Sequence, residues 1–332
     1  MKQTPHSKES APQHSQRRFA LLMLAILLLI LGGTWLIRYP QGYVNILLGH
    51  YVGTTSVLDE LDELKPTPAE EELLLPLEQE FDDWKQTHLA DPLSLTASCD
   101  GTALKGSFYD MGGDVTVIGL HPFDSNAEGD FLYVPYYAAR GYNIFLPDLR
   151  SHGESDGFLV TWGYYESRDL IDWMDALDQT YGSQTYVLHG QDLGANTALG
   201  AAGDPRVALI TAESPILPIC DGLRYILTER FHFPGFLMPV VDWNANQLLP
   251  DDLTLNTLSL PEAKDSDTPL LLLSSGSTGL ADPQAVKAFY QEYHGPKALI
   301  EDSDASQGMV YPRRQAEVEE ELDRMLQQVL FP

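Results

Sequence analysis

The sequence predicts an α/β fold in which a mostly parallel sheet is covered by helices on both faces. Three observations support this prediction. Short runs rich in Val, Ile and Leu alternate with helical segments from about residue 94 to the C-terminus. These runs are apolar at nearly every position, which is typical of strands buried on both sides. The chain has 332 residues and is 44% hydrophobic, so it can form a sizeable core.

The elements of this domain, residues 94–332, follow in a regular order. The runs that predict strands are 115–120, 142–148, 185–190, 207–212, 269–275 and 297–302. The segments that predict helices are 129–141, 166–181, 193–202, 283–293 and 314–330. Residues 214–262 interrupt the alternation and are rich in Pro, Phe and Leu. We interpret them as a short cap insertion packed over one end of the sheet.

An uncharged apolar segment, residues 19–37, precedes the domain. As a helix it would be about 28 Å long, close to the thickness of a bilayer core. Residues 1–18 carry four cations and one acid, which predicts a cytoplasmic N-terminus. We therefore expect a single-pass anchor in the cell membrane, with the lipid bilayer as partner and an extracytoplasmic main domain. A cleaved signal peptide is the alternative, but no small-x-small cleavage site follows the long apolar run.

Residues 38–93 are predicted to form an acidic, helical connecting region. Leucines recur at helical spacing among many Asp and Glu residues, which indicates short amphipathic helices with solvated charged faces. Pro66 and Pro68 are predicted to break these helices.

Composition excludes several classes of function. The chain has 20 Lys and Arg against 48 Asp and Glu, a net charge of −28, which argues against nucleic-acid binding. Two cysteines, Cys99 and Cys220, are too few for a disulfide scaffold or a four-thiolate zinc site, and we expect both to be unpaired rather than bridged. No clustered His and Asp spacing indicates a metal, and no motif predicts a cofactor.

Two motifs carry specific chemical signals. Residues 146–157, LPDLRSHGESDG, directly follow a predicted strand. Residues 188–200, LHGQDLGANTALG, read as a strand, a tight turn and a helix of small residues. Within this turn, Gly190 and Gly194 flank Asp192 in the layout of a nucleophile elbow. Such a turn projects its middle residue above the sheet, at a helix N-terminus that favours negative charge.

These motifs together resemble the α/β-hydrolase superfamily, most closely its membrane-anchored bacterial branch of serine hydrolase-like proteins with peptidase- or esterase-type relatives. The resemblance covers about residues 95–330, including a hairpin at 99–110 and the last strand and loop at 297–311. It implies an α/β-hydrolase fold. It also implies that the backbone N–H groups of Phe123 and Leu193 are the oxyanion donors.

The sequence departs from the family pattern at all three catalytic positions. Asp192 stands where the family usually has a nucleophilic Ser, and Gln307 stands where it has His. The position of the family's acid falls on Gly279 or Leu280. Two nearby carboxylates, Glu213 and Asp282, are candidate substitute acids.

Three functions are compatible with these residues. The first, which we predict, is a catalytically degenerate hydrolase that serves as a binding or scaffold module for an unidentified small molecule or protein. The second is an active hydrolase with Asp192 as nucleophile or base, assisted by Glu213 or Asp282. Relatives of the haloalkane dehalogenase and epoxide hydrolase types use an elbow Asp, but they need a His to activate the water that hydrolyses the ester.

The third function is a ligand-binding module in which Asp192 pairs with a cationic ligand under the cap insertion. The aromatic residues that would line its pocket are Phe231, Phe233, Phe236 and Trp243.

Overall fold

The computed structural model describes residues 13–48 and 65–331, except 128, 130, 252, 261–262 and 277–278. For residues 13–22, 30, 35, 36 and 46 it describes the backbone alone. The predicted tail, residues 1–18, therefore lies mostly outside the described residues.

The described residues form one sheet of eight strands in the order β1-β2-β4-β3-β5-β6-β7-β8. The strands are β1 (Asp91–Thr96), β2 (Ala103–Tyr109), β3 (Val115–Leu120), β4 (Asn143–Pro147), β5 (Thr185–Gln191), β6 (Val207–Glu213), β7 (Leu270–Ser274) and β8 (Lys297–Glu301). β2 is antiparallel to both of its neighbours, and every other pair is parallel. The mostly parallel sheet is therefore confirmed. The hairpin spans residues 91–109 rather than 99–110, so the sheet begins before residue 94.

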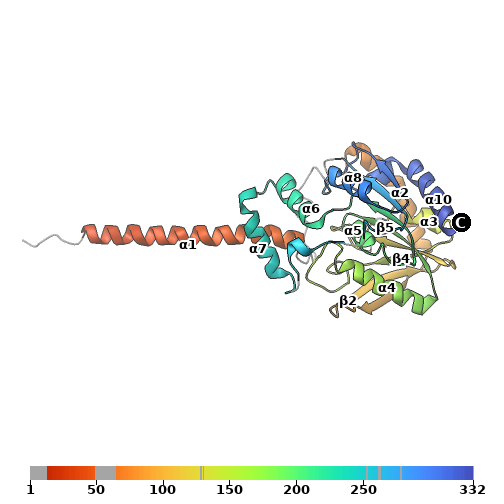
Figure 1. The fold of residues 1–332 in the computed structure, drawn as a ribbon, viewed down its shortest axis with the longest axis horizontal. Coiled ribbons are helices and arrows are strands. Elements are labelled where there is room, and N and C mark those ends of the chain that lie inside the picture. The colour runs from red at the N-terminus through yellow and green to blue at the C-terminus, as the bar shows by residue number, and fades with distance from the viewer. Residues whose placement is uncertain are drawn as a thin grey trace, which may run out of the picture.

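Most of the helices pack around this sheet, and the long N-terminal helix extends away from it (Figure 1). They are α1 (Gln13–Leu48), α2 (Pro68–Thr87), α3 (Val134–Ala138), α4 (Glu166–Tyr181), α5 (Leu193–Gly200), α6 (Ile219–Tyr225), α7 (Met238–Leu248), α8 (Pro283–Glu292), α9 (Val310–Arg313) and α10 (Gln315–Leu330). Among the described residues of the predicted helix 129–141, only Val134–Ala138 is α-helical. Pro135 stands in its first turn, where the missing N–H is tolerated, and Gly141 follows it with a φ of 76°.

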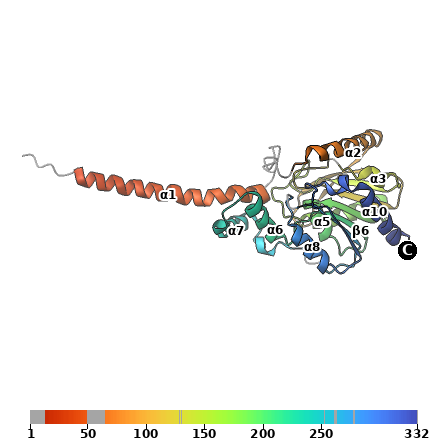
Figure 2. The same cartoon turned by 90° about the horizontal axis from the view of Figure 1, so that it is seen from above.

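Side chains of the central strands alternate between two cores, one on each face of the sheet. Ile118, Phe145 and Leu188 pack in the core under α4, α5 and α8. Their neighbours Val117 and Val187 pack in the core under α2, α3 and α10. Figure 2 shows the second set of helices on the side of the sheet opposite α8. This period of two explains why the strand runs are apolar at every position.

The α2 helix belongs to the folded body. Leu77, Phe81 and Trp84 are buried against the sheet, and the helix runs unbroken through Pro76. Residues 65–67 are not helical and Pro68 is the first residue of α2, where proline costs no hydrogen bond, so a helix boundary does lie at the predicted prolines. Residues 49–64 of the predicted connecting region lie outside the described residues.

One helix of the described chain, α1, is long and apolar enough to cross a membrane by length and composition. Its qualifying stretch is Met23–Asn45, which overlaps the predicted segment 19–37. The helix extends away from the body in both views (Figures 1 and 2). Its last turns pack on the body, with Val44, Leu47 and Leu48 buried.

The predicted cap insertion consists of short helices between β6 and β7. It contains α6 and α7, a π-helical turn η3 (Ile226–Arg230) and two 3-10 turns, η4 (Gly235–Leu237) and η5 (Leu255–Thr257). Two of the aromatic residues predicted to line a ligand pocket contact α1 instead: Phe233 stacks on Tyr39 at 5.5 Å, and Phe231 meets Tyr43 edge-on at 5.5 Å. Cys99 and Cys220 are both unpaired, as predicted.

Candidate active site

The candidate site lies at the turn between β5 and α5. Asp192 caps α5 with a φ of 39° and a ψ of −100°, a strained conformation for a residue with a side chain. The two flanking glycines are required by close backbone approach. A Cβ on Gly194 would lie 2.1 Å from the carbonyl oxygen of Leu120, and one on Gly190 would lie 2.3 Å from the carbonyl group of Gly194. The turn has the geometry of a nucleophile elbow.

The carboxyl group of Asp192 occupies the site where the family resemblance places the oxyanion. Its Oδ1 accepts a hydrogen bond from the N–H of Phe123 at 2.9 Å and another from the N–H of Leu193. These are the two groups that the family resemblance assigns as oxyanion donors. In an acyl-transfer enzyme they would face the oxygen of the tetrahedral intermediate. Here the side chain of the elbow residue itself takes both bonds.

Burial dominates the electrostatics of this carboxyl group. Asp192 is 1% exposed. Desolvation raises its pKa to about 8, and Asp124 adds to the rise, while the hydrogen bonds from Leu193, Phe123 and Gln307 act in the opposite direction. The N-terminus of α5 also favours negative charge at this position.

Gln307 lies beside Asp192, as the motif order predicts. Its Nε2 donates to Asp192 Oδ2 at 3.0 Å, and its Oε1 accepts from the N–H of Leu280 at 2.5 Å. The side chain thus links the elbow to the loop after β7, as a triad His would. A neutral amide, however, cannot take up a proton as a general base does.

The position of the family's acid faces Gln307 but holds no carboxylate. A Cβ on Gly279 would lie 3.1 Å from Gln307 Oε1, so a side chain there would point at the amide. Leu280 contributes its backbone N–H instead. Asp282 accepts from the N–H of Gln284 at 2.9 Å and caps α8, a structural role in which it touches neither Asp192 nor Gln307 among the described contacts.

Glu213 lies on the neighbouring strand without contacting the Asp192 carboxylate. Its backbone carbonyl accepts from the N–H of Asp192 at 2.9 Å. Its side chain accepts from the N–H of Val310 at 3.1 Å and so holds the start of α9. Burial raises the pKa of Glu213 to about 7. The contacts assign it to loop positioning.

The histidines near the elbow make structural contacts with loops or with a neighbouring helix. His121 Nε2 lies 3.0 Å from the N–H of Leu149, and burial lowers the His121 pKa to about 3. His152 Nε2 lies 2.8 Å from the carbonyl oxygen of Phe123. His189 Nδ1 lies 3.1 Å from the hydroxyl of Tyr137. None of these rings bonds to Asp192. No cluster of potential metal ligands occurs among the described residues.

Two residues that support the site were not predicted from the sequence, although Thr67 and Glu70 have the spacing of a helix capping box. Trp162 stacks on Phe123 with a centroid separation of 4.9 Å, and its Nε1 donates to the carbonyl oxygen of Leu47 at 2.8 Å. These two contacts connect the end of α1 to the loop that carries Phe123, one of the two oxyanion donors. Glu70 of α2 accepts from the backbone N–H and the hydroxyl of Ser306, at 3.0 and 2.7 Å, and so holds the loop that carries Gln307.

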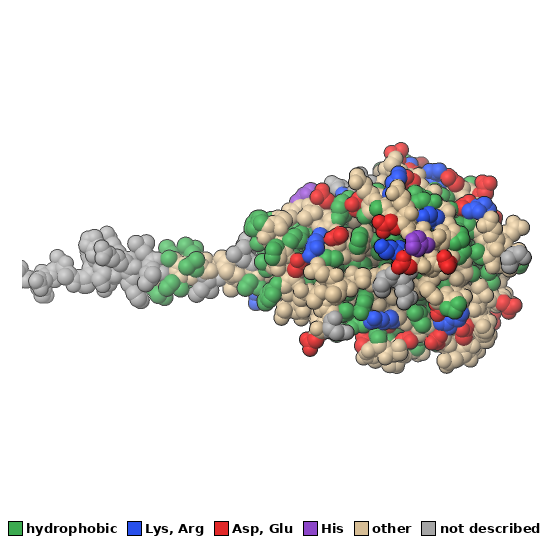
Figure 3. All heavy atoms as spheres, viewed as in Figure 1, with side chains coloured by type: hydrophobic (Ala, Val, Ile, Leu, Met, Phe, Trp, Pro, Cys, Tyr) green, Lys and Arg blue, Asp and Glu red, His purple; other side chains and the backbone are tan. Residues whose placement is uncertain are grey.

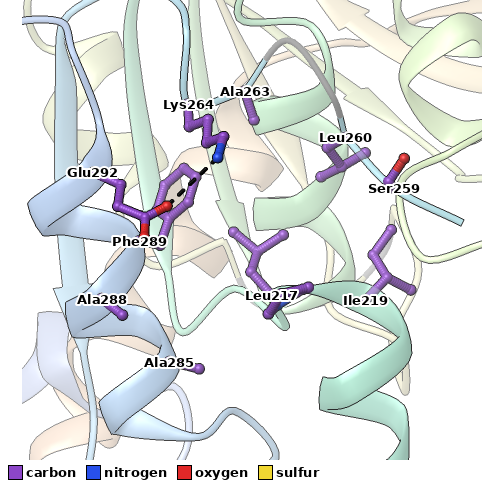
Figure 4. Close-up of a pocket in the computed structure, with 11 residues that line it drawn as sticks. Leu217, Ile219, Ser259, Leu260, Ala263, Lys264, Ala285, Ala288, Phe289 and Glu292 are labelled. Carbon is purple, nitrogen blue, oxygen red and sulfur yellow. Dashed lines mark ion pairs between the residues drawn. The ribbon is translucent and has the colours of Figure 1, made fainter. Parts of the chain in front are cut away.

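A separate pocket of about 450 Å³ lies between α8 and the two ends of the cap insertion, residues 217–219 and 259–260 (Figure 4). Its lining is mostly apolar, and an ion pair between Lys264 and Glu292, at 3.6 Å, lies on one side. None of Asp192, Gln307 and Phe123 lines it. The pocket is therefore distinct from the elbow.

Comparison with known proteins agrees with this architecture. The model of the "Alpha/beta hydrolase family" matches residues 117–326. The uncharacterized protein YqkD of Bacillus subtilis (strain 168) is 25% identical over 227 residues, covering 63% of this chain and 72% of that protein.

Solved structures show the same fold at low identity. The Pyrococcus furiosus esterase Pf2001 has a TM-score of 0.59 at 21% identity, covering 73% of this chain and 92% of its own. An alpha-beta hydrolase from Vibrio vulnificus has a TM-score of 0.56 at 15% identity, covering 84% of this chain and all of its own. With a family model that spans more than half of its length, and with the sheet and elbow described above, the chain belongs to the alpha/beta hydrolase family.

Proposed function

We propose that this protein is a membrane-anchored, extracytoplasmic member of the family that has lost hydrolysis and acts as a binding or scaffold module. The observation that carries the proposal is the position of Asp192 Oδ1, which occupies both backbone donors of the oxyanion site. The apolar stretch of α1 and the basic residues before it support the anchor and its orientation.

The residues at the elbow and around it oppose each step of acyl transfer. The elbow offers no hydroxyl, and Gln307 offers no base to activate one. An oxyanion forming here would have to displace the Asp192 carboxyl group from Phe123 and Leu193, and where that group is ionised it would also repel the oxyanion. Losing one member of a Ser–His–Asp unit already lowers the rate by orders of magnitude.

The test is hydrolysis of p-nitrophenyl acetate and butyrate by the full chain in detergent. We expect background rates for the natural sequence and for Asp192→Ala. Asp192→Ser alone should stay at background, because no base would activate the hydroxyl. The triple variant Asp192→Ser, Gln307→His, Gly279→Asp should gain measurable turnover, since the added carboxylate would point at residue 307.

One result would overturn the proposal. Turnover by the natural sequence that disappears in Asp192→Ala would assign Asp192 as a working nucleophile or base. Mass spectrometry of the protein after incubation with alkyl halide and epoxide substrates would then locate an ester on Asp192. An unmodified Asp192 together with background rates supports the loss of hydrolysis.

A further inference from the structure

Side-chain exposure along α1 changes abruptly near Ile37. The large apolar side chains described between Met23 and Ile37 are 40% to 76% exposed. From Pro40 onward the helix turns buried side chains toward the body. The uncharged run of the sequence ends at the same place, because Arg38 is the first charged residue after Arg18. The level of Ile37 is therefore where an inserted α1 would leave the hydrocarbon.

The cap lies beside α1 at this level. Asn244 of α7 donates its Nδ2 to the carbonyl oxygen of Ile37 at 3.3 Å. Two residues further, Tyr39 stacks on Phe233 with an interplanar angle of 13°. Both ribbon views show α7 against α1, at the end of the body from which α1 emerges (Figures 1 and 2). These contacts place this part of the cap beside the point at which the apolar stretch of α1 ends.

Two large aromatic side chains of the cap face outward here. Phe236 in η4 is 80% exposed, and Trp243, next to Asn244 in α7, is 52% exposed. In the space-filling view, hydrophobic side chains gather at the end of the body that joins α1 (Figure 3). Aromatic rings, Trp above all, are enriched at the boundary between hydrocarbon and water.

We infer that the cap is a second membrane contact, in which Phe236 and Trp243 enter the interfacial region of the bilayer that α1 crosses. This inference rests on the proposed anchor. The chain is strongly acidic, with a net charge of −28, so the contact depends on apolar rings rather than on attraction to anionic lipids. Zwitterionic vesicles are therefore the suitable membrane for a test.

The experiment places an environment-sensitive fluorophore on the cap of the full chain in phosphatidylcholine vesicles. In a background of Cys99→Ser and Cys220→Ser, Phe236→Cys carries the NBD label. The matched control is Phe331→Cys, another exposed Phe (73%), at the C-terminal end away from α1 (Figure 1). Lipids with a nitroxide near the headgroup should quench the label at 236 several-fold more than the label at 331, with emission shifted to the blue.

A third label separates this inference from the anchor proposal. Leu28→Cys places it on the exposed apolar part of α1. Quenching at 28 without quenching at 236 overturns the cap contact and leaves the anchor standing. No lipid quenching at either position rejects the anchor, and the cap contact with it. A blue shift at 236 that depends on protein concentration but not on lipid quenchers also overturns the inference, because a second copy would then cover the cap.

Discussion

The carboxyl group of Asp192 makes the stability of the fold depend on pH. Burial raises its pKa to about 8, well above the roughly 3.9 of an Asp in an unfolded chain. The folded state therefore binds this proton more tightly than the unfolded chain does. The resulting stabilisation is fully present below about pH 4 and is lost as the pH rises through 8.

Asp192→Asn removes this titration. We expect its free energy of unfolding, relative to that of the natural sequence, to increase between pH 4 and pH 8 by on the order of 5 kcal/mol and then to level off. Denaturant unfolding of the full chain in detergent across this range measures the difference. The titration of Glu213 is common to both proteins and cancels.

Asp282→Asn is the control for that series, because it also replaces an Asp that caps a helix, but one that bonds the N–H of Gln284 and neither Asp192 nor Gln307 among the described contacts. Asn and Asp are nearly equivalent at such positions, so its difference from the natural sequence should stay small. A constant difference for Asp192→Asn from pH 4 to 9 would show that the buried carboxyl does not titrate as described.

The sequence predicts the members of the site better than their contacts. Asp192 and Gln307 could be assigned because each stands in a local motif, and the structure brings them within 3.0 Å. The occupation of the oxyanion donors could not be assigned. It depends on how a side-chain rotamer at the elbow meets the N–H of Phe123, 69 residues away in the chain. No periodicity or motif carries such long-range geometry.

Among the elements, the buried strands and amphipathic helices were predictable because each has its own hydrophobic period. The α4 helix begins and ends where the sequence predicts, at Glu166 and Tyr181. The α2 helix was predicted as part of a connecting region rather than of the folded body, because its many acidic residues hide the spacing of Leu77, Phe81 and Trp84. Those side chains are buried by the sheet, a tertiary contact that local propensity does not encode.

The first turn of α2 provides a test of how elements support the site. Glu70→Gln places an NH₂ group where carboxylate oxygens now accept from Thr67 and Ser306. At least one buried donor then loses its partner, at a cost of about 1–3 kcal/mol in the free energy of unfolding. Hydrogen exchange should also become faster in residues 302–309, the loop that carries Gln307.

Glu71→Gln is the matched variant, since it removes the same charge one position along the helix from an exposed side chain. It should change the stability by a few tenths of a kcal/mol, the size of a helix-dipole effect. Equal losses in the two variants would mean that the charge, and not the bonds to Ser306, matters at position 70.

At the scale of the whole molecule, the proposed topology has a direct consequence for protease access. In spheroplasts that carry the full chain with an epitope at each end, an added protease should remove the C-terminal epitope and leave the N-terminal epitope on a short protected fragment. The result follows from the basic residues that precede the apolar stretch. A chain released in a soluble, shortened form would indicate instead that the apolar segment is cleaved.

The continuity of α1 with the body has a further consequence. The helix passes from its apolar stretch into the contacts with Trp162 and the cap without an intervening linker. A domain on a flexible tether samples a wide volume, and its effective concentration at any one place is low. With α1 in a bilayer, this body is instead held at one height and one inclination. Its effective concentration is then high for ligands and proteins in the same membrane, and low for those that diffuse farther above it.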